Sequence, residues 1–191
     1  WDLHIHTPGT LKNDQYEGKT IEEKWDNFYD TITHYIGDGT DPLRTIEVIG
    51  ITDYLSIDNY NKVMSDGRLP DSIKLVLPNV ELRMVPLAKT APVNIHCIFD
   101  PGYADDLESR FFSKLKFSFY NSSYSASHSE LIRLGRDYKN DKELTDAQAY
   151  ATGINQFVLE FSSLKKIFDE DQDLREHCII VVSNSSGDGV S

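Results

Sequence analysis

The sequence predicts an α/β fold, because apolar strand-like runs alternate with amphipathic helical segments along most of the 191 residues. The strand-like runs, such as "IEVIGIT" (46–52) and "VNIHCIF" (93–99), are continuously apolar rather than strictly alternating. That pattern is typical of strands covered on both faces. We therefore expect parallel strand pairing within a single domain over residues 1–191.

Caps, breakers and hydrophobic periodicity set the predicted elements. Thr20 and Glu23 form a capping box before a stripe of apolar residues at helical spacing, and Gly37 is expected to end that helix. Pro78 is expected to split one apolar stretch into two short strands. The expected strands are 2–6, 46–52, 73–78, 80–84, 93–99 and 178–183; the expected helices are 20–36, 58–65, 105–115, 129–138 and 146–176, the last broken near 162–163; residues 120–129 are expected to be a loop.

Composition limits the classes of protein that fit. The formal net charge is −12, which argues against a broad nucleic-acid-binding face rich in lysine and arginine. It does not exclude an enzyme acting on phosphoesters, because a metal site gathers carboxylates and bound cations reverse the local charge. No apolar run approaches the length of a transmembrane helix and no signal peptide is visible, so we expect no membrane association.

Two further features concern the setting of the chain. Its only cysteines, Cys97 and Cys178, lie in apolar runs and do not form a disulfide framework, which favours a reducing, cytoplasmic location. The sequence opens at Trp1 without a methionine and stops soon after an apolar strand, so we expect it to be part of a longer protein.

The motif "DLHIHT" (2–7) raises the question of a metal site. In a strand, His4 and His6 point to one face while Leu3 and Ile5 point to the other. Two imidazoles on one face can bind one metal ion, although two partly exposed histidines at a strand end remain the alternative.

Further candidate ligands follow at the ends of the next strand-like segments. Asp53 closes "GITD", Glu81 lies in "PNVELR" and His96 lies in "VNIHCIF". Sites in parallel α/β folds lie at the carboxyl ends of strands, so we expect these side chains to meet the histidine pair. A set of histidines and carboxylates without thiolates suits Zn²⁺, Mn²⁺ or Fe²⁺.

These motifs, in this order, resemble the early motifs of the polymerase-and-histidinol-phosphatase (PHP) family. The wording "WDLHIHTPGT", "GITDYLSIDNY", "LPNVELR" and "VNIHCIFD" is similar to the N-terminal PHP domain of the TrlF-like ATPases, which are linked to nucleic-acid metabolism. The resemblance implies a distorted (β/α)7 TIM-like barrel, here incomplete at its C-terminus, and two or three divalent metal ions (Zn, Mn or Fe).

The resemblance also implies roles for particular residues. His4 and His6 would bind one metal, Glu81 would bridge two, and His96 would bind a second. The second motif of the family commonly reads Thr-Asp-His, whereas here Tyr54 follows Asp53, which places one ligand in question. The family's late Asp-x-His motif is absent from the later part of this sequence, so the activity of the chain by itself stays open.

The function that follows as an expectation is metal-dependent phosphoester hydrolysis, with DNA or RNA as candidate substrates and a fused or associated ATPase region as a partner. Asp53, Glu81 and Arg83 are the candidate catalytic residues. Arg83 would share a face with Glu81 and can grip a phosphate through two hydrogen bonds, or it can serve as a structural partner of an acidic group.

Two other functions remain open. One is an amidohydrolase-type metal hydrolase, since His-x-His also marks that barrel family, although Glu81 in the bridging role favours the PHP interpretation. The other is a degenerate PHP domain that acts as a structural or sensing module, which the Thr-Asp-Tyr departure supports.

Overall fold

The structure is a computed structural model of the chain and describes residues 1–11, 15–37, 40–41, 45–85 and 92–182. It is an α/β protein with a mixed main sheet. The elements of the described residues are, in chain order, β1 (Asp2–Ile5), α1 (Ile21–Ile36), β2 (Val48–Tyr54), α2 (Asp58–Asp66), β3 (Leu75–Val85), β4 (Val93–Phe99), a 3-10 helix (Pro101–Asp106), a π-helix (Glu108–Phe112), β5 (Lys116–Phe119), β6 (Ser122–Ser125), α3 (His128–Lys139), α4 (Asp146–Gln156), β7 (Leu159–Glu160), α5 (Phe161–Glu170), α6 (Gln172–Glu176) and β8 (Cys178–Val182).

The strands form two sheets. The main sheet has the order β1-β2-β3-β4-β8, with β7 pairing to β3, and β5 and β6 form a separate antiparallel pair. β1 pairs with β2 in parallel, and β7 with β3 in parallel, as the alternation of strands and helices predicts. The strands that the structure describes do not close into a barrel.

The chain divides into two compact units, and the division passes through β3 and β4. The first unit comprises Trp1–Val80 with Ile98–Pro101, and the second comprises Glu81–Cys97 with Gly102–Ser191.

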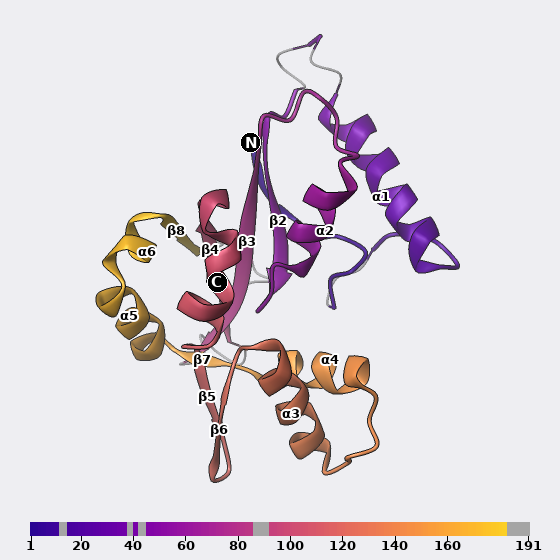
Figure 1. The fold of residues 1–191 in the computed structure, drawn as a ribbon. Helices are drawn as coiled ribbons and strands as arrows, with labels where there is room; N and C mark the ends of the chain where they lie inside the picture. Colours follow the sequence, from indigo (N-terminus) through magenta and orange to yellow (C-terminus); the bar gives the residue numbers. More distant parts are fainter. Residues whose placement is uncertain (12–14, 38–39, 42–44, 86–91, 183–191) are drawn as a thin grey trace. The chain divides into compact units, whose positions relative to one another are not determined.

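In the first unit, β1 and β2 are accompanied by α1 and α2 (Figure 1). The α1 helix begins as predicted, since the Thr20 side chain accepts a hydrogen bond from the Glu23 backbone. Glu23 reaches back to the backbone N–H of Lys19 rather than to that of Thr20. The apolar stripe of α1 is buried from Trp25 to Ile36, whereas Ile21 at its start is exposed. Every residue of β2 from Ile49 to Tyr54 is buried, so both faces of the strand are covered, which explains its continuously apolar sequence.

In the second unit, α3 and α4 pack against each other at two glycines. A Cβ atom on Gly135 would lie 1.9 Å from the Ala149 carbonyl oxygen, and one on Gly153 would lie 2.0 Å from the Leu131 carbonyl oxygen. No side-chain rotation relieves these contacts, because backbone oxygens are involved. The two helix backbones therefore approach closely only because neither glycine has a side chain.

We expect Gly153→Ala to lower the free energy of unfolding by about 3 kcal/mol, because overpacking against a backbone atom forces α3 and α4 apart. The helix propensity of alanine works in the opposite direction by about 1 kcal/mol, so a net loss identifies the steric effect. Urea unfolding measures the change. Asn155→Ala, at an exposed position of the same helix, is the control and should cost nothing; equal stability of the two variants would contradict the close packing.

Several sequence predictions for the elements are wrong. Pro78 does not interrupt its strand, because β3 runs unbroken from Leu75 to Val85. The serine-rich segment is not all loop, since β6 lies within it and pairs with β5. The last helical stretch breaks at β7, and α5 continues through Ser162 and Ser163. The helix expected at 105–115 is present as a 3-10 helix followed by a π-helix.

None of the helices that the structure describes is long and apolar enough to cross a membrane.

Candidate metal centre

The side chains of His4, in β1, and His6, just after it, contact each other through their Nε2 nitrogens. The Nε2 atoms of His4 and His6 lie 3.1 Å apart, and the ring centroids are separated by 4.8 Å with the planes inclined at 66°. His6 follows directly after the last residue of β1, so the alternation of a strand explains why both rings leave on one side. This contact is a hydrogen bond in which one imidazole donates and the other accepts, and a cation that replaced the shared proton would have both nitrogens directed at it.

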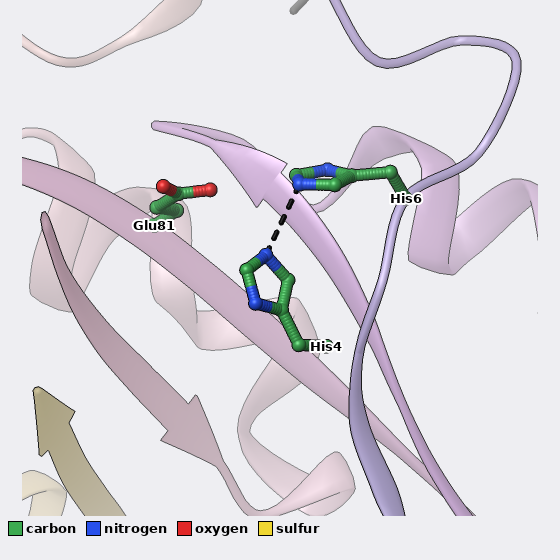
Figure 2. Close-up of side chains that lie close together, drawn as sticks. All are labelled: His4, His6 and Glu81. Carbon is green, nitrogen blue, oxygen red and sulfur yellow. Dashed lines mark hydrogen bonds between the residues drawn. The ribbon is translucent and has the colours of Figure 1, made fainter. Parts of the chain in front are cut away.

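The carboxylate of Glu81 joins this pair. His4, His6 and Glu81 each offer one ligand atom, and the three atoms lie within 4.8 Å of one another (Figure 2). Glu81 is 1% exposed, His6 is half-buried and His4 is exposed. Among the described residues, this is the group of histidine, cysteine and acidic side chains that can hold a metal ion; we call it the His4–His6–Glu81 cluster.

The separation of the two imidazole nitrogens fits a metal ion. Two nitrogens bound to a tetrahedral zinc at about 2.0–2.1 Å lie about 3.3 Å apart, and the observed separation of the imidazole nitrogens is 3.1 Å. The three ligand atoms of the cluster lie within 4.8 Å of one another, which is wider than the spacing of atoms bound to one zinc ion. The donor set of two imidazoles and a carboxylate suits zinc, manganese or iron.

The protonation of His6 also suits a metal ligand. Burial lowers the pKa of His6 to about 4, and the neighbouring His4 ring contributes to this decrease. A hydrogen bond with the backbone of Thr52 acts in the opposite direction and raises the pKa. The imidazole is therefore neutral at physiological pH and its lone pair is available. The Tyr54 ring lies parallel to that of His6, with the centroids 6.2 Å apart.

Asn79 fixes the strand that carries the two histidines. Its side-chain amide donates to the carbonyl oxygen of Leu3 at 2.7 Å and to the Thr52 hydroxyl at 2.9 Å. These two bonds tie β1 and β2 to β3 next to His4. The role of Asn79 was not foreseen from the sequence, although its place two residues before Glu81 on the same face of a strand was readable.

Asn94 plays a similar part for Glu81 within the second unit. Its amide donates to Glu81 Oε1 at 2.6 Å, and both side chains belong to the paired strands β3 and β4. This bond orients the carboxylate. His96 lies two residues beyond Asn94 in β4, so the two residues share a face of that strand, and His96 is 3% exposed. His96 is not a member of the His4–His6–Glu81 cluster.

The Asp53 carboxylate is hydrogen-bonded to the first turn of α2. Its oxygens accept from the Asn59 backbone at 3.0 Å and from the Asn59 amide at 2.5 Å, and Thr10 donates to it at 3.4 Å. Burial raises its pKa to about 6, and the hydrogen bonds from Asn59 act against that rise. Asp53 is not a member of the cluster either, and its hydrogen bonds to Asn59 are those of a group that anchors a helix start.

Arg83 reaches the end of α4. Its guanidinium donates to the carbonyl oxygens of Ile154 and, at 3.2 Å, of Phe157. These carbonyls belong to the last turn of a helix, where a cation is favourable. The contacts match the structural alternative for Arg83 rather than a phosphate clamp.

We expect Asp53→Asn to lower the free energy of unfolding by about 1–2 kcal/mol, because an amide has one acceptor oxygen where three donors converge. Affinity for Mn²⁺ or Zn²⁺ should change by less than about threefold, since Asp53 lies outside the cluster. Urea unfolding and a metal titration of the same variant measure both effects. A loss of metal affinity of about 10–100-fold would instead show that Asp53 supports a ligand.

The chain matches no protein-family model, and a search of curated proteins found no match.

Proposed function

We propose that the chain is a metal-dependent phosphoesterase that hydrolyses nucleic-acid phosphodiesters. The observation that carries the proposal is the 3.1 Å separation of the His4 and His6 Nε2 atoms, with the Glu81 carboxylate in the same cluster. The choice of phosphoester and of nucleic acid rests on the motifs that resemble the PHP family and its TrlF-like branch.

The residues of the cluster would have different roles in metal binding. His4 and His6 would hold a divalent ion, and the Glu81 carboxylate, oriented by Asn94, would share it or bridge to a second. Such ions neutralise the phosphodiester, lower the pKa of a bound water and stabilise the leaving oxygen. His96 is the candidate for a further ligand, because it lies on the same face of β4 as Asn94, which bonds the Glu81 carboxylate.

The wider setting belongs to the same proposal. We propose that the strands of the main sheet form part of a distorted (β/α)7 barrel, and that the chain works beside an ATPase region in the cytoplasm. A metal-centred site also agrees with the net charge of −12, since the cations needed to attract a phosphodiester would come from the metals rather than from lysine or arginine.

A second candidate function is a degenerate PHP domain that serves as a sensing or structural module. It is favoured by the contacts of Asp53 and Arg83, both of which hold helix ends and not a common site. A module of this kind would bind one metal or none, whereas a catalytic site of the proposed type needs about two.

The test combines metal content with activity. The chain is stripped with a chelator, reloaded with Mn²⁺ or Zn²⁺, and analysed by mass spectrometry of its metals. It is then assayed on single-stranded DNA, RNA, an aryl phosphodiester and an aryl phosphomonoester. We expect about two metals per chain and metal-dependent cleavage of the diesters.

Three other results would contradict all or part of the proposal. One bound metal without cleavage would overturn the phosphoesterase proposal in favour of the sensing module. Absence of metal binding would overturn both the metal centre and the activity. Cleavage of the monoester alone would retain the phosphoesterase chemistry and remove nucleic-acid phosphodiesters as its substrates.

A further inference from the structure

A hollow of about 470 Å³ opens directly beside the two imidazoles. His4 and His6 form one part of its wall, and α1 and the segment just before that helix form the rest. Every described residue that lines it belongs to the first unit. Its volume lies within the range of pockets that hold a small organic ligand.

The α1 wall presents a regular row of side chains. Asn27, Thr31 and Tyr35 follow one another at intervals of four residues, so they lie on one face of the helix. All three are exposed, and Tyr35 is 64% exposed. The Thr31 hydroxyl donates to Asn27 Oδ1 at 3.1 Å, which fixes the orientation of the carboxamide.

The segment before α1 adds a second amide and a second aromatic ring. Gln15 and Tyr16 both line the hollow. The Tyr16 ring packs edge-on against Phe28, with the centroids 5.4 Å apart, so the hydrophobic core of α1 supports it from behind. The hollow therefore combines two aromatic rings with two carboxamides, which offer both donors and acceptors.

The charge of the wall narrows the class of ligand. The described residues that line the hollow include no lysine or arginine, and Asp2, the one carboxylate among them, accepts a hydrogen bond from the His4 backbone at 3.2 Å. None of these described side chains is a cation that could compensate a phosphate group inside the hollow. An uncharged planar heterocycle finds aromatic faces to stack on and amides to bond its edges.

We propose that this hollow binds the nucleobase of the nucleotide whose phosphate lies at the His4–His6–Glu81 cluster. The inference rests on the proposed function and names the part of its substrate that sets specificity. Tyr35 stacks on the base, and the Asn27 and Gln15 amides bond its polar edge. Because the hollow and the cluster share His4 and His6, a base in the hollow places its own phosphate next to the metal ligands.

The experiment compares two esters with the same leaving group. One is thymidine 5′-(4-nitrophenyl phosphate), which carries a base, and the other is methyl 4-nitrophenyl phosphate, which carries none. We expect Tyr35→Ala to raise KM for the thymidine ester about tenfold with little change in kcat, and to leave the methyl ester unaffected. Tyr35→Phe should retain the wild-type KM, since it keeps the ring.

A matched control and a binding measurement complete the test. Tyr120→Ala removes a tyrosine that is 89% exposed in the second unit, and it should change neither ester. Calorimetric titration with thymidine and adenosine on the metal-free chain should show binding that Tyr35→Ala weakens about tenfold. Glucose and ribose 5-phosphate are the comparison ligands and should bind more weakly than either nucleoside.

The outcomes separate this inference from the proposed function. If neither ester is hydrolysed, the proposed function fails, and the nucleoside titration still decides whether the hollow takes a base. If Tyr35→Ala affects both esters equally, or if glucose binds as well as the nucleosides, the base-binding inference is overturned while the hydrolysis stands.

Discussion

Replacing His4 with alanine is expected to lower the affinity of the chain for Zn²⁺ or Mn²⁺ by at least about 100-fold, and metal-dependent hydrolysis with it. Loss of an outer partner of a ligand already costs about 10–100-fold, so loss of a ligand should cost more. Stability should change by less than about 0.5 kcal/mol, because the His4 side chain is exposed. Competition titration against a fluorescent chelator measures the affinity.

His6→Ala should have the same effect on metal binding with some loss of stability, since His6 is half-buried. The double variant should be little worse than either single one, because the two nitrogens serve the same ion and their effects do not add. His34→Ala is the matched control, as His34 is an exposed histidine of α1. If His34→Ala and His4→Ala bind metal equally well, the cluster is not the metal site.

The parts of the structure that the sequence predicted well depend on neighbouring residues. The capping threonine and the apolar spacing of α1 lie within one helix, and the structure confirms that helix at Ile21–Ile36. The common face of His4 and His6 follows from the geometry of any strand. These inferences need no knowledge of how distant segments meet.

The predictions for Pro78 and for the serine-rich segment were wrong because tertiary packing outweighs local composition there. Pro78 looks like a breaker, yet proline adopts extended backbone and removes only one ladder donor, so packing on both faces keeps β3 whole. The serine-rich segment looks like a loop, yet Tyr124 is 2% exposed and pairs across the hairpin with Phe117. Burial of Tyr124 and its cross-strand pairing with the half-buried Phe117 outweigh the weak strand propensity of the serines around it.

At the candidate site, too, contacts between distant segments could not be predicted from local sequence. Glu81 was a candidate ligand because its motif lies in a strand, but its contact with the histidine pair depends on which strands are neighbours in the sheet. The partners of Arg83 lie 71 and 74 residues away in the chain, so no spacing near Arg83 indicates them. Asp53 accepts hydrogen bonds from Asn59 only six residues on, so this contact is a local one that the sequence spacing allows.

Gly50→Ala is expected to damage both the fold and the metal centre, although no metal ligand is touched. A Cβ atom at position 50 would lie 2.3 Å from the carbonyl oxygen of Leu3 and 2.8 Å from its carbonyl carbon. Leu3 precedes His4 in β1, and its carbonyl also accepts the bond from Asn79. Relief of the clash must therefore move the strand that aims both imidazoles, at a cost of about 1–3 kcal/mol of stability.

The matched control is Gly67→Ala. Gly67 ends α2 at a φ of +60° with nothing within 4 Å of an added Cβ atom, so alanine there costs about 1 kcal/mol of backbone strain without moving β1. Urea unfolding should show a loss in both variants. The metal titration should show a loss of at least about tenfold for Gly50→Ala alone, because the two Nε2 atoms no longer converge within 3.1 Å. Equal metal affinity in the two glycine variants would mean that the position of β1 does not control the centre.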